Sequence, residues 1–147
     1  MVNLSIFGER LSDLMFEHGE MSSKALGAKL NIPAPNIVRY RQGKHAPNIK
    51  NLIKIADFFN CSTDFLLGLE DEIPSLTFKT CPPFATQLVF IVKHFNYTFK
   101  EFYQELKIPE SSFFEWKNGS SLPTIDNILK IAEHFGCRVD FILGREN

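Results

Sequence analysis

The sequence predicts an all-α protein built from two tandem five-helix units, and three observations support this prediction. Shifting the chain by 76 positions aligns Asn51–Ala56 with Asn127–Ala132 and Asp64–Gly68 with Asp140–Gly144, without a gap. Apolar residues in both halves recur at intervals of three or four, as on one face of a helix. Glycine and proline interrupt both halves at matching places, which indicates that the helices end at matching places too.

The helices of the first unit are predicted from their apolar spacing and from residues typical of helix ends. Phe7, Leu11 and Leu14 have the spacing of the first helix. Serine and threonine favour helix starts, proline is tolerated in a first turn, and glycine or asparagine favours the left-handed turn after a helix. In chain order the expected boundary residues are His18-Gly19, Ser22 or Ser23, Asn31, Pro33, Gly43, Pro47-Asn48, Ser62 or Thr63, and Gly68.

The second unit is expected to follow the same plan. Its third helix begins at Pro109, its fourth at Pro123-Thr124, and its fifth covers Val139–Leu143. The apolar residues expected in its core are Phe84, Leu88, Ile91, Val92, Phe102, Leu106, Phe113 and Trp116.

The segment between the two units has the composition of a linker. Residues 70–83 contain three prolines and no helical period. We therefore expect one unit at residues 1–70, a linker at 71–82 and a second unit at 83–147. Units of roughly 65 residues are of a size at which many domains fold alone.

Composition excludes several classes of protein. A net charge of −1 excludes the whole chain as a general binder of polyanions. No apolar run is long enough to span a bilayer, and Met1–Ile6 lacks the pattern of a signal peptide, so we expect a soluble, cytoplasmic protein. The three cysteines form no Cys-x-x-Cys pair. We interpret them as small buried apolar side chains, with a redox switch or an interdomain disulfide as the alternative.

The two halves differ in local charge. The window Met21–Ala56 contains seven lysine and arginine residues and no acidic residue. The matching window Tyr97–Ala132 contains four basic and five acidic residues. This difference predicts that the first unit binds a polyanion and that the second unit has another role.

The first unit resembles the XRE family of helix-turn-helix domains, of the lambda-repressor and Cro type. The resemblance rests on Met21–Ile32, Asn36–Lys44, Pro47 and the stretch from Leu52 to Gly68. It extends over residues 5–70 and, more loosely, over 83–147. It implies two tandem five-helix lambda-repressor-like domains, the second degenerate, with the third helix of the first domain in the major groove of double-stranded DNA.

The resemblance also implies a set of DNA-binding residues. At the expected base-reading positions, Arg39 suits guanine or a phosphate, and Asn36 suits adenine or a phosphate. Ala34 and Pro35 offer only apolar contact, for example to a thymine methyl group. The whole set is Ser22, Ser23, Lys24, Ala34, Pro35, Asn36, Arg39, Gln42, Lys44 and His45. Arg41 departs from the family, which commonly has an acidic residue there, and the sequence does not show what replaces the usual ion pair.

The second unit departs from the family pattern where contact with DNA would occur. Tyr103 stands at the position of Gly27, where two helices cross closely, and Glu110 and Glu115 would face phosphates. Phe99 and Phe114 fall at positions expected to point outward, which is typical of a protein contact. We therefore expect these four outward residues to mediate self-association or to hold the first unit. The alternatives are that the two rings pack against the linker or the first unit, or that the second unit touches DNA weakly.

These observations together predict a sequence-specific DNA-binding transcriptional regulator of bacterial or phage origin, acting as a repressor and as a homodimer. The alternative is a protein–protein adaptor or anti-repressor that does not bind DNA. We expect no enzymatic activity, no catalytic residues, no cofactor and no small-molecule substrate. We also expect no metal, because His18 and His94 lack clustered partners and instead suit the end of a helix dipole.

Overall fold

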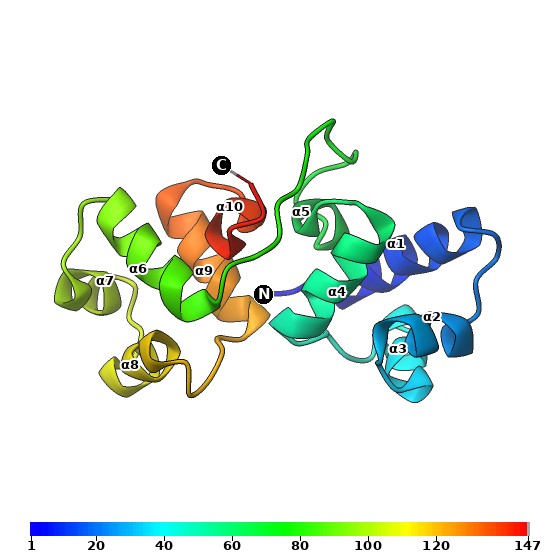
Figure 1. Cartoon of the computed structure of the whole chain (residues 1–147), viewed down its shortest axis with the longest axis horizontal. Helices are drawn as coiled ribbons and strands as arrows, with labels where there is room; N and C mark the ends of the chain where they lie inside the picture. Colours follow the sequence, from blue (N-terminus) through cyan, green and yellow to red (C-terminus); the bar gives the residue numbers. More distant parts are fainter. Residues whose placement is uncertain (147) are drawn as a thin grey trace. The chain divides into compact units, whose positions relative to one another are not determined.

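The computed structural model describes residues 1–146, and within that range it contains ten helices and no strand. The predicted all-α fold is therefore confirmed. The chain divides into two compact units, unit 1 (Met1–Leu76) and unit 2 (from Thr77 onward), and the division falls inside the segment expected to be a linker (Figure 1). No helix in the described part of the chain is both long and apolar enough to cross a membrane.

Unit 1 has five helices, and the boundary residues expected from the sequence lie at or near their boundaries. The helices are α1 (Leu4–Glu17), α2 (Ser23–Leu30), α3 (Ala34–Arg41), α4 (Ile49–Phe59) and α5 (Thr63–Leu66). The side chains of Ser22, Asn48 and Ser62 accept hydrogen bonds from backbone N–H groups in the first turns of α2, α4 and α5. Each of these caps satisfies a donor that the helix itself cannot. Asn31 ends α2 in the left-handed conformation, with φ 55°.

The core of unit 1 lies between the inner faces of its helices. α1 packs against α3 and α5, α2 packs against α3 and α4, and α4 packs against α5 (Figure 1). The fully buried apolar side chains are Phe7, Leu11, Met15, Leu26, Ile37, Ile55, Ala56, Cys61 and Leu66. Burying one side chain the size of leucine contributes about 1.5–3 kcal/mol, so this core holds the outer helices in place.

Two glycines bring α3 close to α2 and α1. A Cβ atom on Gly27 would lie 2.5 Å from the carbonyl oxygen of Ile32, and one on Gly8 would lie 2.6 Å from that of Tyr40. Both obstructing atoms belong to the backbone, which cannot rotate away as a side chain can. The packing of α1, α2 and α3 therefore depends on the absence of side chains at these two positions.

Unit 2 also has five helices. They are α6 (Phe84–His94), α7 (Phe99–Glu105), α8 (Glu110–Asn118), α9 (Ile125–Phe135) and α10 (Val139–Leu143). α7, α8 and α9 begin 76 positions after α2, α3 and α4, the same offset that relates the two halves of the sequence. All eight apolar residues expected in the core of this unit are buried.

The turn between α7 and α8 keeps its form although its residues differ. The Ile108 N–H donates to the Tyr103 carbonyl at 2.8 Å, and Lys107 has the left-handed φ of 55° that Asn31 has in unit 1. The Tyr103 ring lies 5.6 Å from the ring of Phe113 and 6.2 Å from that of Phe114. Accordingly, α8 packs more extensively against α6 than against α7, whereas α3 packs on α2 and α1 alike.

The rings of Phe99 and Phe114 are half-buried, so they are less exposed than their positions in the sequence predict. The Phe99 ring lies 5.6 Å from that of Phe113, with the Lys117 ammonium 5.2 Å above it. The Phe114 ring lies 5.3 Å from that of Phe113. The aromatic side chains around Tyr103 form one cluster. Rings that helical spacing alone would place in solvent thus shield one another from water.

Unit 2 contains a fully buried ion pair near its C-terminus. Arg145 Nη1 donates to Asp140 Oδ1 at 2.6 Å, and neither side chain has exposed area. The Arg145 guanidinium lies 4.4 Å from the centre of the Phe78 ring, and the Lys79 N–H donates to the Arg145 carbonyl at 2.7 Å. Residues 78 and 79, which were expected to belong to the linker, are therefore attached to unit 2.

Gly27→Ala is expected to lower the free energy of unfolding by about 1–3 kcal/mol, because the added Cβ overlaps the Ile32 carbonyl. Chemical denaturation followed by circular dichroism measures the change. Lys29→Ala, at an exposed position of the same helix, is the control and should change stability by less than about 0.5 kcal/mol. Equal effects of the two substitutions would contradict a close helix crossing at Gly27.

Arg145→Met is expected to destabilise unit 2 by about 3–5 kcal/mol, because it leaves the Asp140 carboxylate buried without its closest partner. Fluorescence of Trp116, the single tryptophan of the chain, reports the unfolding of this unit. Adding Asp140→Asn to Arg145→Met removes the buried charge and should recover part of the loss. A double variant as unstable as the single one would show that shape, rather than charge, accounts for the effect.

Candidate nucleic-acid interface

α3 turns one face toward the core and the other toward solvent. Ile37 and Tyr40 are buried, whereas Pro35, Val38 and Arg39 are exposed. Pro35 is the second residue of the helix, where a missing N–H costs no intrahelical hydrogen bond. The packing of the inner face therefore fixes which side chains α3 offers to a partner.

Arg39 and Asn36, the two polar residues expected to read bases, contact one another. Arg39 Nη1 donates to Asn36 Oδ1 at 3.3 Å. This bond uses one of the five guanidinium N–H groups and one acceptor of the amide. Both side chains therefore retain donors that can bind a base edge or a phosphate.

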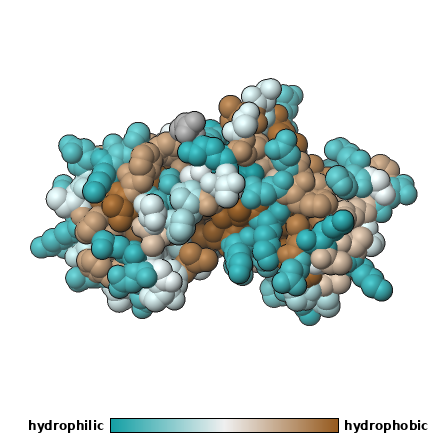
Figure 2. Space-filling view, in the orientation of Figure 1, coloured by the Kyte–Doolittle hydropathy of each residue, from teal (hydrophilic) through white to brown (hydrophobic). Residues whose placement is uncertain are grey.

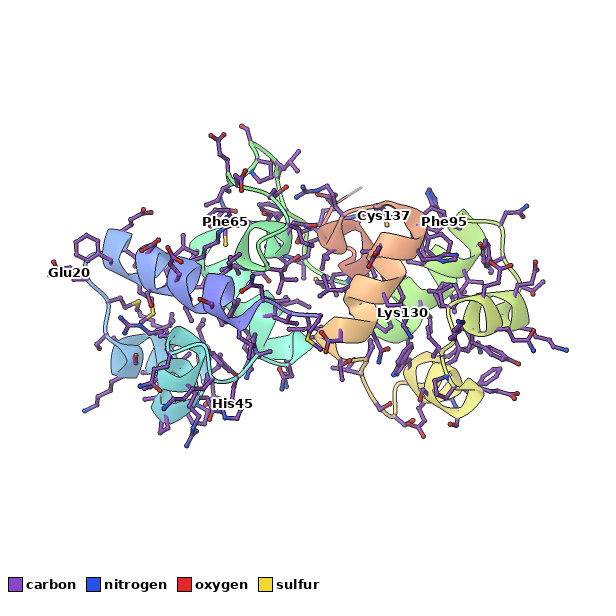
Figure 3. The ribbon with its side chains drawn as sticks, turned by 180° about the vertical axis from the view of Figure 1, so that it is seen from behind. Glu20, His45, Phe65, Phe95, Lys130 and Cys137 are labelled. Atoms are coloured by element: carbon purple, nitrogen blue, oxygen red, sulfur yellow. The ribbon has the colours of Figure 1, made fainter. Side chains whose placement is uncertain are left out.

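Two depressions in the surface flank Arg39. One, of about 310 Å³, is lined by Asn36, Arg39, Tyr40, His45, Ala46, Asn48 and Asn51. The other, of about 450 Å³, is lined by Ala34, Pro35, Val38, Arg39, Gln42 and Lys44. Seven of the ten residues expected to bind DNA thus line one depression or both, and Figure 3 shows His45 beside the side chains of α3.

Hydrogen bonds that the sequence did not predict hold the wall of the first depression. The amide nitrogen of Asn51 donates to the Tyr40 hydroxyl at 3.1 Å, and the Asn48 side chain accepts from the Asn51 N–H at 2.8 Å. Asn48 and Asn51 were missed as site residues. Asparagine before an apolar stretch is a signal for a helix cap, but nothing in the local pattern places the start of α4 beside α3.

The second depression has an apolar side. Ala34, Pro35 and Val38 line it together, and the Val38 side chain is 39% exposed. Val38 was also missed, although an apolar residue on the outer face of a helix is a signal that sequence analysis can use. Such a surface can contact an apolar group on a base edge, such as the thymine methyl.

The three remaining predicted residues lie at the start of α2 and line neither depression. The Ser22 hydroxyl accepts from the Ala25 N–H at 3.1 Å and caps the helix. The Ser23 hydroxyl accepts from Arg41 Nη1 at 3.0 Å, and Lys24 is exposed. The structure thus shows the partners of Arg41, which the sequence left open.

The corresponding surface of unit 2 differs in charge. Glu110 and Glu115 are both exposed on α8, and the Ser121 hydroxyl donates to the Glu115 carboxylate at 3.2 Å. Burial, and next the charge of Glu110, raise the pKa of the Tyr103 phenol. On the face that Figure 2 shows, hydrophilic and apolar residues both occur on each unit.

Comparisons with known proteins agree with this geometry. A family model described as helix-turn-helix matches residues 16–66, which run from the end of α1 to the end of α5. The HTH-type transcriptional regulator ImmR of Bacillus subtilis (strain 168) is 31% identical over 107 residues, which are 73% of this chain and 72% of that protein. No solved structure matches the chain significantly. The chain therefore belongs to the helix-turn-helix family of transcriptional regulators.

Proposed function

We propose that unit 1 binds double-stranded DNA with α3 in the major groove, and that the chain regulates transcription by occupying an operator. The arrangement around Arg39 carries this proposal, because seven of the ten predicted residues line two depressions that share its side chain. The window that contains them has seven basic residues and no acidic one. Phosphate attraction and contact with base edges are thus available on one surface.

The residues around α3 suggest a division of roles. Arg39 and Asn36 would contact base edges, and the apolar side of the second depression would contact a thymine methyl group. Gln42, Lys44 and His45, which follow α3, would contact phosphates and supply affinity without sequence choice. With two polar readers on the helix, a single unit 1 would recognise few base pairs.

A homodimer would compensate for this small number of contacts. Two copies of unit 1 on half-sites about one helical turn apart would double the number of base contacts. A bound dimer would then repress transcription by blocking access of the polymerase to the promoter. This repressor mode is the simplest one that needs no further site on the chain.

We propose that unit 2 is a degenerate copy of the same domain, with the domains at 1–70 and 83–147 and a linker at 71–82, of which residues 78 and 79 pack on unit 2. Glu110 and Glu115 stand where unit 1 has Ala34 and Arg39, so α8 would repel phosphates. The rings of Phe99 and Phe114 keep part of their surface exposed on the helices α7 and α8, so this surface suits a protein contact in self-association. The proposed partner is a second copy of the chain.

Selection of sheared genomic DNA by the full chain tests the function. The wild type should enrich a discrete sequence. Arg39→Ala should bind that sequence about 1–3 kcal/mol more weakly if the guanidinium contacts a base. Lys93→Ala removes a charge from an exposed position in the last turn of α6, outside both proposed surfaces. It is the control, because it should leave the affinity for DNA unchanged.

Each outcome of the selection has a definite meaning. A symmetric enriched sequence would support binding as a dimer. If no sequence is enriched even at low salt, the proposal fails, and a protein–protein adaptor or anti-repressor becomes the better explanation. Wild-type affinity in Arg39→Ala would remove Arg39 from the set of base-reading residues.

A further inference from the structure

Arg41 joins the three helices that surround the proposed interface. Its Nε donates to the Ser12 hydroxyl of α1 at 3.2 Å, and its Nη1 donates to the Ser23 hydroxyl of α2 at 3.0 Å. Arg41 itself is in the last turn of α3 and is exposed. These two hydrogen bonds connect α1 and α2 to the end of α3. They also hold the Arg41 guanidinium in a defined position.

The hydrogen-bonding capacity of this cluster is not exhausted by its internal bonds. A guanidinium has five N–H groups, of which the two serines take two. Each serine oxygen accepts from Arg41, so each hydroxyl hydrogen remains available for donation. Three N–H groups and a neighbouring hydroxyl are the donors that a tetrahedral oxyanion requires.

The charge of Arg41 is not neutralised by the partners described for it. Both partners are neutral hydroxyls. The sequence window that contains Ser23 and Arg41 has no acidic residue. An arginine held in this way favours a planar, two-pronged contact with a phosphate over an ion pair within the protein.

We propose that Arg41 and Ser23 form a binding site for one phosphate of the DNA backbone, with Ser12 as a positioning residue that orients the guanidinium. This inference rests on the proposed function of unit 1. It gives the end of α3 and the start of α2 one shared phosphate, which would fix how deeply α3 enters the groove. The partner is a phosphodiester, and free inorganic phosphate is the other source of the same chemistry.

The salt dependence of DNA affinity tests the site on the sequence that the wild type selects. Arg41→Gln should lower the affinity about tenfold. It should also reduce the slope of log affinity against log salt by about 0.9, the loss of one phosphate contact. Lys29→Gln removes a charge from the last turn of α2, away from the cluster, and should change the slope by much less.

Ser12→Ala separates positioning from charge. It keeps the guanidinium charge but removes the bond that orients it, so the affinity should fall severalfold while the slope of log affinity against log salt stays at the wild-type value. Ser23→Ala removes a donor to the phosphate and should weaken binding to a similar degree. If Ser12→Ala and Arg41→Gln both lower thermal stability but leave the affinity for DNA unchanged, Arg41 only holds the helices together and the proposal is wrong.

Neutral methylphosphonates placed one at a time in the DNA backbone locate the phosphate. One position should weaken the wild type about tenfold and leave Arg41→Gln unaffected, because the contact is already lost. If every position affects both proteins equally, the phosphate site is contradicted while DNA binding stands. If the wild type selects no sequence, the proposed function has failed first. A different result is that inorganic phosphate protects Arg41 from an arginine-modifying reagent while no methylphosphonate changes the affinity for DNA. That result would assign the site to free phosphate and overturn the proposal.

Discussion

The close approach of backbone to backbone at Gly27 is the constraint on which the outer surface of unit 1 depends. A Cβ there would lie 2.5 Å from the Ile32 carbonyl, in the turn after α2, and 3.3 Å from the backbone nitrogen of Ala34, at the start of α3. No side chain therefore fits between α2 and the start of α3. The left-handed turn at Asn31 then sets the direction of α3. Because Ile37 and Tyr40 are buried on the inner side of α3, the side that carries Arg39 faces solvent. A domain that reads DNA needs such rigidity, because a helix that rotates would present different side chains to the groove.

Unit 2 shows the consequence of relaxing the same constraint. Its turn is retained at Lys107, yet Tyr103 fills the crossing with a ring that packs on aromatic side chains of α8. α8 is then held mainly by α6. Glu115 replaces Arg39 on its outer side. Loss of the close crossing and loss of positive charge thus occur together, as the proposal of a degenerate copy that does not enter a groove requires.

Local features were predictable from the sequence, and contacts between distant segments were not. The starts of α2, α4 and α5 and the turn after α2 were predicted, because serine and asparagine caps and the left-handed turn at Asn31 act within a few residues. The partial burial of the Phe99 and Phe114 rings was not predicted, because the cluster that covers them comes from two different helices. The bond from Asn51 to Tyr40 spans 11 positions and those of Arg41 span 18 and 29. No helical period encodes such contacts, so the walls of the site could be found only in the folded chain.

Arg41 stands where the family commonly has an acidic residue. In unit 1 it would raise the affinity for any DNA without adding recognition of bases. An acidic residue paired within the domain would contribute no attraction to DNA, whereas a guanidinium held by two neutral hydroxyls adds a full positive charge at the interface. Ala34 and Pro35, in contrast, offer no hydrogen bond to a base. A surface with strong phosphate attraction and few base contacts binds DNA of any sequence appreciably. Selectivity would then have to come from Arg39 and Asn36, from apolar contact at Val38 and from the spacing of two half-sites. On this argument, association of two chains is a requirement for specificity and not an addition to it.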